Sequence, residues 1–241
     1  MDKQNLPPTR RRVLVVGGTT SIGAAVLHAL AAADMQVLAT GRSWPVGSYQ
    51  HESIAHAQLD LLSKESMDSF AREAIPAFGK IDVALFLAGI LPGKNLAGYS
   101  DDLMHEVMTV NFTAQAALLQ RLLPHFAPGA QVLMISSISG ERGSFDPIYA
   151  ASKAAQIAFV KSLATWLAPG IRFNAIAPAL IDNSSMYNDM APERRAHHVA
   201  QTPTKRLTTM EEIAGIVVDL CGPAWSNLNG QVIRINGGAH V

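Results

Sequence analysis

The sequence predicts a doubly wound α/β fold, in which helices cover both faces of a parallel β-sheet. Short runs of apolar and β-branched residues alternate along the chain with longer segments of helical period. This alternation is typical of βαβ units and of a parallel sheet that is buried on both faces. A chain of 241 residues lies near the upper limit for one hydrophobic core, so we expect a single domain over residues 1–241.

The individual elements follow from this pattern. Seven strands are expected, at residues 13–16, 36–40, 54–59, 83–87, 131–135, 171–177 and 231–235. The helical segments between them are residues 22–33, 64–78, 102–123, 147–167 and 211–220. Asp146 followed by Pro147 is typical of an N-cap with proline in the first helical position. Thr209 with Glu212 forms a capping-box pattern at the start of the last helix.

One long segment shows neither the helical nor the strand period of apolar residues. Residues 182–203 are polar and rich in methionine, so we expect them to be irregular. They follow the carboxyl end of a predicted strand, where α/β proteins place the loops that cover ligands. We therefore predict that residues 182–203 form a substrate lid within the domain, with Met186, Tyr187 and Met190 as candidate pocket residues.

Composition excludes several classes of protein. Nineteen Lys and Arg residues balance nineteen Asp and Glu residues, which argues against a nucleic-acid partner, and we expect the run Arg10 to Arg12 to be a solvated arm. A single cysteine, Cys221, forms no internal disulfide and is expected to be buried, which favours the cytoplasm. No apolar run reaches the ~20 residues of a membrane span. The eight histidines show no zinc-binding spacing, so no metal is expected.

A glycine-rich turn follows the first predicted strand. The segment from Gly17 to Gly23 lies between that strand and an alanine-rich helix. Glycines permit a tight turn and a close approach of the backbone to a pyrophosphate, which the helix N-terminus attracts. The order of strand, turn and helix therefore predicts a dinucleotide-binding site. The alternative is a glycine-rich connection that binds nothing.

The end of the second strand indicates which dinucleotide binds. NAD sites usually carry an acidic residue there for the ribose 2′-hydroxyl, but no Asp or Glu follows this strand before Glu52. Arg42 instead offers a permanently charged, planar fork that suits a 2′-phosphate, with Ser43 as a second donor. We therefore predict NADP, with NAD less favoured. The alternative is that Arg42 only faces solvent.

A tyrosine, a lysine and a group of serines form the candidate catalytic site. Tyr149 and Lys153 are four residues apart, which places them on one face of a helix. A nearby ammonium group and the helix N-terminus both stabilise tyrosinate, so we expect a lowered pKa for Tyr149. Ser136, Ser137 and Ser139 follow a strand end at the same edge of the sheet. The hydroxyls of serine and tyrosine are thus expected to converge on one carbonyl oxygen.

These motifs together resemble the short-chain dehydrogenase/reductase family. They are the turn 17–23, Asn111, the serines of 136–140, Tyr149 with Lys153, the segment 174–178, and Asn236 with Gly237 and Gly238. The resemblance runs from about residue 13 to the C-terminus in the family's order. It implies a Rossmann fold with the strand order 3-2-1-4-5-6-7, and a homotetramer.

The resemblance also implies roles for individual residues. Tyr149 is the general acid/base, Lys153 is its partner and a ligand of the nicotinamide ribose, and Ser137 holds the carbonyl. Asn111 holds a water that links Lys153 to solvent. The implied cofactor-binding residues are Gly17, Thr19, Thr20, Ser21, Ile22, Gly23, Arg42, Ser43, Asp60, Leu61, Ala88, Gly89, Tyr149, Lys153, Pro178, Ile181 and Asn183.

The sequence departs from the family pattern at four positions. Ser21 replaces the middle glycine of the turn, where its side chain either caps the helix or contacts phosphate. Leu87 replaces an asparagine, so a hydrogen-bonding side chain near the central strands is lost. Ala179 replaces a glycine, and Asn183 stands where a threonine often contacts the carboxamide. These changes bear on cofactor affinity more than on reaction type.

The predicted function is NADP-dependent interconversion of a ketone or aldehyde and an alcohol. Two alternatives keep the same fold: a nucleotide-binding regulator without catalysis, and an enzyme similar to nucleotide-sugar epimerases or dehydratases. The expected pocket, residues 90–94, 139–148 and the lid, mixes apolar and charged side chains, so both apolar and charged small-molecule substrates stay open.

Overall fold

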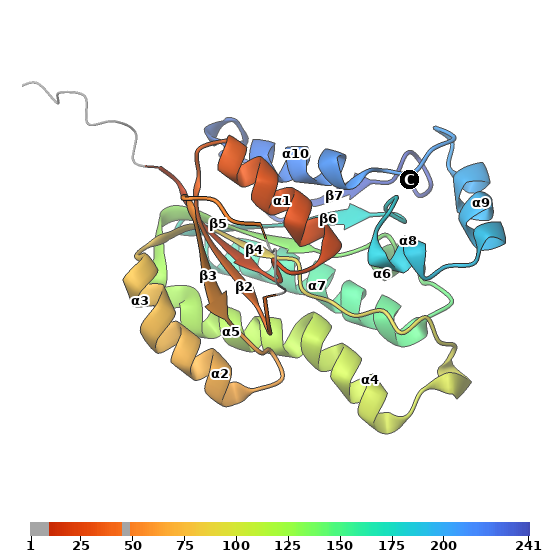
Figure 1. The fold of residues 1–241 in the computed structure, drawn as a ribbon, viewed down its shortest axis with the longest axis horizontal. Coiled ribbons are helices and arrows are strands. Elements are labelled where there is room, and N and C mark those ends of the chain that lie inside the picture. The colour runs from red at the N-terminus through yellow and green to blue at the C-terminus, as the bar shows by residue number, and fades with distance from the viewer. Residues whose placement is uncertain (1–9, 45–48) are drawn as a thin grey trace, which may run out of the picture.

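The computed structural model describes residues 10–44 and 49–241, which form one α/β domain. Its seven strands form a single sheet in the order β3-β2-β1-β4-β5-β6-β7, and every neighbouring pair is parallel, as predicted (Figure 1). The strands are β1 Arg12–Val16, β2 Gln36–Gly41, β3 Ile54–Gln58, β4 Ile81–Phe86, β5 Phe126–Ile135, β6 Ile171–Pro178 and β7 Val232–Ile235.

Helices cover both faces of this sheet (Figure 1). One face carries α1 Ser21–Ala32 and α10 Met210–Cys221, and the other carries α2 Lys64–Ser69, α3 Ile75–Phe78, α4 Asp101–Met108, α5 Ala114–Leu122 and α7 Pro147–Trp166. Along β1, Val13 and Val15 belong to the core under α1 and α10, whereas Leu14 and Val16 belong to the core on the opposite face. The apolar run of this strand therefore serves two cores.

Helix ends follow the predicted capping chemistry. The Asp146 carboxylate accepts a hydrogen bond from the Tyr149 N–H at the start of α7, with Pro147 in the first turn. Thr209 and Glu212 form a complete capping box at the start of α10. Short 3₁₀ turns lie at Leu96–Gly98, Leu123–His125 and Pro223–Trp225.

Two of the predicted long helices each contain a π-helical turn. Phe70–Ala74 lies between α2 and α3, and Thr109–Thr113 lies between α4 and α5. Such turns occur frequently at functional sites, because they redirect side chains within a helix. The second turn carries Asn111, whose side chain is buried.

Two expectations about irregular regions are wrong. Residues 182–203 contain α8 Ser185–Asn188 and α9 Pro192–Gln201, because a serine caps the first helix and proline followed by glutamate starts the second. The arginine run is not a solvated arm. Arg12 begins β1, its N–H donates to Asp82, and the Arg11 guanidinium donates to the carbonyl of Cys221.

The strand order reverses between β1 and β4, and open α/β sheets form their ligand crevice at such a point. The chain crosses from the edge strand β3 to β4, which pairs with β1 on the side opposite β2. The N–H groups of Leu87 and Ala88 both donate to the carbonyl of Val16, so the loop after β4 lies against the glycine turn. No helix in the described part of the chain is long and apolar enough to cross a membrane.

Candidate active site

The glycine turn after β1 depends on two of its glycines. Gly17 has a φ of +96°, and a Cβ atom there would lie 2.6 Å from the nitrogen of Ala88. A Cβ on Gly23 would lie 2.6 Å from the carbonyl oxygen of Gly18, so α1 can pack on the turn only without a side chain there. The close approach of these backbone segments is the geometry that a pyrophosphate site requires.

The residue that caps α1 differs from the expectation. Thr20 is the N-cap, and its hydroxyl accepts a hydrogen bond from the Gly23 N–H at 2.9 Å. Ser21 is the first helical residue, and its hydroxyl accepts from the N–H of Ser185 at 3.4 Å. Ser21 therefore connects the turn to α8 in the predicted lid.

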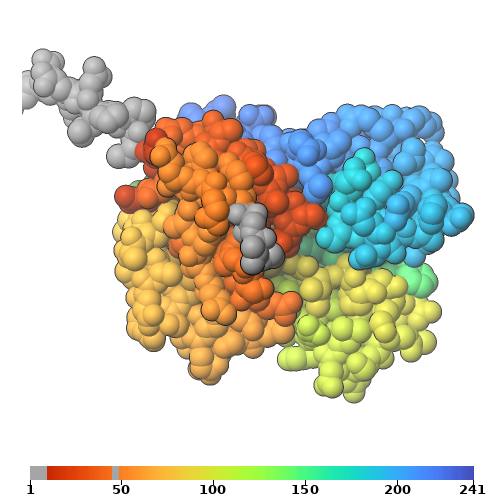
Figure 2. Space-filling model, in the orientation of Figure 1, coloured from red at the N-terminus to blue at the C-terminus, as the bar shows by residue number. Residues whose placement is uncertain are grey.

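Two adjoining cavities lie at the carboxyl edge of the sheet, where the surface is hollowed between the red and orange N-terminal segments and the cyan and blue lid segment (Figure 2). The large cavity has a volume of about 810 Å³ and the small cavity about 350 Å³. Both are lined by Thr20, Gly89 and Ile90, so they form one continuous crevice at the switch point.

The small cavity brings together most of the residues predicted to bind the adenosine half of the cofactor. Its lining includes Gly17, Thr19, Thr20, Arg42, Ser43, Asp60, Leu61, Ala88 and Gly89. Arg42 and Ser43 are exposed at its edge. One carboxylate oxygen of Asp60 accepts from the Leu62 N–H, which fixes the turn after β3. A concave site with a glycine turn, a capped helix N-terminus and an arginine fork fits a dinucleotide that carries a 2′-phosphate.

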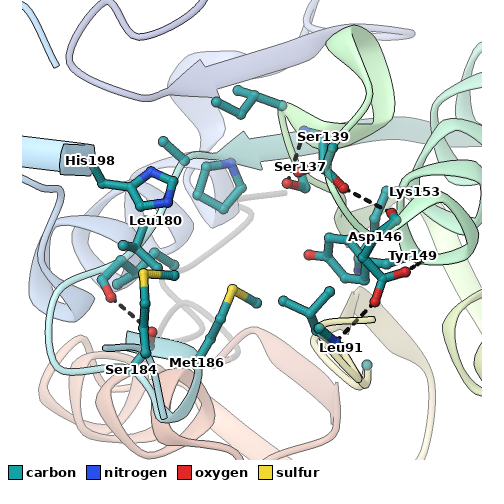
Figure 3. A pocket seen from close by; sticks show the side chains of 18 of the residues that line it. Leu91, Ser137, Ser139, Asp146, Tyr149, Lys153, Leu180, Ser184, Met186 and His198 are labelled. Carbon is teal, nitrogen blue, oxygen red and sulfur yellow. Dashed lines mark hydrogen bonds between the residues drawn. The ribbon is translucent and has the colours of Figure 1, made fainter. Parts of the chain in front are cut away.

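The large cavity holds the predicted catalytic side chains. Ser137, Tyr149 and Lys153 lie on one wall beside Asp146, and Leu180, Ser184, Met186 and His198 lie on the opposite wall (Figure 3). The predicted cofactor residues in its lining are Thr20, Ser21, Ile22, Gly89, Tyr149, Lys153, Pro178 and Ile181. Gly23, Asn111 and Asn183 line neither cavity. The predicted lid thus forms one side of the crevice.

Tyr149 is held as a phenol in this structure. Burial raises the pKa of Tyr149 to about 12; hydrogen bonding to Ser137 opposes this rise, and the negative charge of Asp146 adds to it. The expected lowering of this pKa by Lys153 is therefore not found. Lys153 Nζ lies 5.8 Å from the centre of the tyrosine ring, and burial lowers the pKa of Lys153 itself to about 7. The same burial therefore favours the uncharged form of both side chains, the amine of Lys153 and the phenol of Tyr149.

The Ser137 hydroxyl has one hydrogen, which can donate either to Tyr149 or to a ligand in the large cavity. Its hydroxyl oxygen accepts a hydrogen bond from the Ser139 N–H at 3.1 Å. The hydroxyl hydrogen can then point into the cavity. The neighbouring Ser136 instead donates to the backbone carbonyl of Lys153 at 2.9 Å, so it anchors α7 to β5.

Asn111 reaches the crevice indirectly. Its side-chain oxygen accepts from the Ile90 N–H at 2.8 Å, and its amide donates to the Ile90 carbonyl and to Ser152 Oγ, both at 3.0 Å. Gln115 donates to the carbonyl of Ala88 at 2.8 Å. These two side chains hold the loop after β4 by hydrogen bonds to its backbone.

Asp146 does more than cap α7. One carboxylate oxygen accepts from the Tyr99 hydroxyl at 2.6 Å, and the other accepts from the N–H groups of Gly93 and Lys94. Because Asp146 is 3% exposed and accepts these hydrogen bonds, it fixes the loop 90–99 to the start of α7. The burial of Tyr99 and its contact with this carboxylate raise the pKa of the tyrosine.

Four further polar residues of the site were missed from the sequence: Tyr99, Gln115, Ser152 and Gln156. Gln115 lies one helical turn after Asn111, and Gln156 lies one turn after Lys153, and both belong to the buried faces of their helices. A polar residue on a buried face at this spacing was the available signal. Among the described residues, no group of three or more His, Cys, Asp or Glu side chains is arranged to hold a metal ion.

The fold and the crevice define the class of protein. A glycine turn at the switch point of a parallel sheet, beside a cavity lined by Ser137, Tyr149 and Lys153, is the arrangement of an oxidoreductase on a nucleotide-binding Rossmann fold.

Comparison with known proteins identifies the family. The family model described as "Enoyl-(Acyl carrier protein) reductase" matches residues 16–240. The 3-oxoacyl-[acyl-carrier-protein] reductase FabG of Aquifex aeolicus is 32% identical over 237 residues, which cover 93% of this chain and 95% of that protein. The enzyme of the same name from Escherichia coli is 28% identical over 236 residues, which cover 95% and 96%.

The structural comparison agrees. The crystal structure described as short-chain dehydrogenase/reductase SDR:Glucose/ribitol dehydrogenase, from Brucella melitensis, matches with a TM-score of 0.89 and 28% identity. The match covers 96% of this chain and 97% of that one. The chain belongs to the short-chain dehydrogenase/reductase family and is an oxidoreductase, as its motifs predict.

Proposed function

We propose that the protein is an NADP-dependent reductase that converts a ketone or aldehyde into an alcohol, with Tyr149 as the proton donor. One observation carries this proposal: the large cavity with Ser137, Tyr149 and Lys153 is continuous with the small cavity that Arg42 borders. A site for hydride transfer and an anchor for a 2′-phosphate thus belong to one crevice.

NADPH, when bound, supplies the hydride that adds to the carbonyl carbon. The turn from Gly17 to Gly23 and the N-terminus of α1 would hold the pyrophosphate. Arg42 and Ser43 hold the 2′-phosphate, and Asp60 with Leu61 borders the adenine. Lys153 holds the nicotinamide ribose, and the segment from Pro178 to Ile181 borders the nicotinamide.

Three side chains handle the substrate oxygen. The Ser137 hydroxyl donates a hydrogen bond to the carbonyl, which stabilises the negative charge that develops on its oxygen. Tyr149 then transfers its phenolic proton to that oxygen, and solvent restores the proton to the tyrosinate. Lys153 stabilises the tyrosinate while it is charged.

The names of the relatives, 3-oxoacyl-[acyl-carrier-protein] reductases, support reduction as the working direction. Carbonyl reduction requires Tyr149 as a proton donor. Burial raises the pKa of Tyr149 to about 12, so the phenol carries its proton at neutral pH, as an ordinary tyrosine also does.

Three further expectations stay predictions. The segment 182–203, which lines the large cavity through Ser184, Met186 and His198, acts as the substrate lid. The protein assembles as a homotetramer, which light scattering would detect as a mass about four times the 25.7 kDa of one chain. It acts in the cytoplasm.

The test is a titration of the purified protein with NADPH and with NADH, followed by nicotinamide fluorescence, and then a panel of carbonyl compounds. We expect preferential binding of NADPH and carbonyl-dependent oxidation of NADPH. Tyr149→Phe should lower kcat by about 10²- to 10⁴-fold and leave the Kd for NADPH nearly unchanged. A preference for NADH would overturn the cofactor assignment, and binding without turnover on any carbonyl would overturn the proposed reaction.

A further inference from the structure

Two glutamines lie buried behind Lys153, and the mechanism above uses neither. Gln115 on α5 and Gln156 on α7 are both 0% exposed. A buried amide is costly unless its polar atoms have hydrogen-bond partners. Every polar atom of these two side chains has one.

The hydrogen bonds fix the direction of both amides. Gln115 Nε2 donates to the carbonyls of Ala88 at 2.8 Å and Val110 at 3.0 Å, so Gln115 Oε1 must face Gln156. Gln156 Nε2 donates to Gln115 Oε1 at 3.0 Å and to the carbonyl of Asn111 at 2.8 Å. Rotating either amide by half a turn would place an oxygen against a carbonyl oxygen. Gln156 Oε1 is therefore directed away from these partners.

That oxygen lies against the ammonium group of Lys153. Lys153 Nζ donates to Gln156 Oε1 at 3.2 Å and to the carbonyl of Ile135 at 2.7 Å. Two of its three N–H bonds are thereby held on the protein side. The nitrogen also lies beside the crevice, because a Cβ on Gly89 would be 3.5 Å from it. The third N–H remains for a ligand in the large cavity.

We propose that Gln156 is a positioning residue for Lys153, which it holds through a chain of oriented amides that ends on the loop at Ala88. This inference rests on the proposed function, in which Lys153 serves the cofactor and Tyr149. These hydrogen-bonded amides link Lys153 to the loop that borders the small cavity. They thereby fix the position of the lysine relative to that cavity. Aligned amides also polarise one another and favour the charged form of the lysine.

The neutral side-chain oxygen of Gln156 is suited to holding the ammonium group of Lys153. Tyr149 is the titratable group that faces Lys153 from its own helix, and β5 contributes the Ile135 carbonyl. The π-helical turn contributes the Asn111 carbonyl, which accepts from Gln156. Within the described residues, burial is the resolved cause of the lowered pKa of Lys153, with no contribution from a charged neighbour. A carboxylate in place of Gln156 would instead draw the ammonium into an ion pair.

Three variants of the full chain test this role. Gln156→Met keeps a side chain of similar length but removes the acceptor. Gln156→Glu keeps the shape and adds a negative charge. Gln120→Met, at an exposed glutamine on α5, is the matched control. Thermal melting first establishes which variants are folded.

The main readout is the pKa of Lys153, followed by NMR in protein labelled with ¹³C at the lysine ε-carbon. The resonance is identified by its loss in Lys153→Met. We expect Gln156→Met to lower this pKa by about 1 to 2, because a hydrogen bond to a charged group is lost. Gln156→Glu should raise it, and Gln120→Met should leave it unchanged.

A second readout is the pH profile of carbonyl reduction. The alkaline limb of kcat should move to lower pH in Gln156→Met and to higher pH in Gln156→Glu. An unchanged lysine pKa in folded Gln156→Met, or an unchanged one in Gln156→Glu if the Met variant does not fold, would overturn the inference. Because the NMR titration needs neither cofactor nor substrate, it tests Gln156 even if the wild type binds no NADPH, a result that would overturn the proposed function instead.

Discussion

The two ends of the crevice are built in different ways. At the large cavity, Ser137, Tyr149 and Lys153 are only 7%, 9% and 4% exposed, and Lys153 donates to the backbone carbonyl of Ile135 in β5. At the small cavity, Arg42 and Ser43 are exposed on the loop after β2. The fold thus fixes the groups proposed for chemistry, while the groups proposed for cofactor selection stand at the surface.

This difference has an energetic reason. A buried polar group must be fully hydrogen-bonded, so its position is determined together with the packing of the core. An exposed arginine is solvated and acquires a fixed geometry only when an anion binds it. Substitutions at the large cavity should therefore affect catalysis or stability strongly, whereas those of the exposed Arg42 and Ser43 at the small cavity should change cofactor preference alone.

The largest effect is expected for Ser137→Ala. Loss of the hydroxyl that donates to the carbonyl should lower kcat by about 10²- to 10³-fold, with little change in the Kd for NADPH. Steady-state kinetics and fluorescence titration would measure the two quantities. Ser162→Ala, at a serine of α7 whose hydroxyl donates to the Ala158 carbonyl of the same helix, is the control. Equal losses in the two variants would argue against a role for Ser137 at the carbonyl.

Gly23→Ala should follow in magnitude. Its Cβ would lie 2.6 Å from the carbonyl oxygen of Gly18, so α1 must shift on the turn, and the free energy of unfolding should fall by about 1 to 3 kcal/mol. Gly215→Ala on α10 is the matched control, because nothing lies within 4 Å of its Cβ position. There we expect a gain of about 0.5 to 1 kcal/mol. Denaturant unfolding measures the free energy of unfolding of both variants. Equal values for the two variants would contradict the prediction.

Arg42→Ala should change cofactor preference without changing stability. Loss of the charged fork should raise the Kd for NADPH about tenfold, while the Kd for NADH stays the same. Arg72→Ala, at an exposed arginine on the π-helical turn after α2, serves as the control. Should the preference for NADPH survive in Arg42→Ala, another group at the small cavity must hold the 2′-phosphate.

The last prediction concerns the pH dependence of the free energy of unfolding. Burial lowers the pKa of Lys153 to about 7, against 10.5 for an ordinary lysine. Between pH 7 and 9 the unfolded chain therefore binds a proton that the folded chain releases, so the free energy of unfolding should rise with pH. The raised pKa of Cys221, about 12 against an ordinary 9.0, opposes this rise from about pH 9, and the raised pKa of Tyr149, about 12 against 10.0, opposes it at higher pH. Denaturant unfolding at pH 7, 8 and 9 should show this rise in the wild type and not in Lys153→Met.

Much of the fold was predictable from local pattern. The apolar runs of β1 and the other strands, the Asp146 cap and the capping box of Thr209 and Glu212 each depend on residues close together in sequence. The helices within residues 182–203 escaped prediction, because the polarity of this segment favours irregular structure. Helix α9 forms despite its polarity, since proline and glutamate in its first turn favour a helix start.

The sequence by itself determined the glycine turn, the pairing of Tyr149 with Lys153 on one helical face, and the family, because each is carried by the identity and spacing of residues along the chain. Only the tertiary structure decided the environment of those side chains. It raised the pKa of Tyr149 instead of lowering it, made Thr20 rather than Ser21 the cap of α1, and joined Gln115 and Gln156 behind the lysine. Burial and hydrogen-bond partners come from segments far apart in sequence, so spacing along one segment cannot specify them.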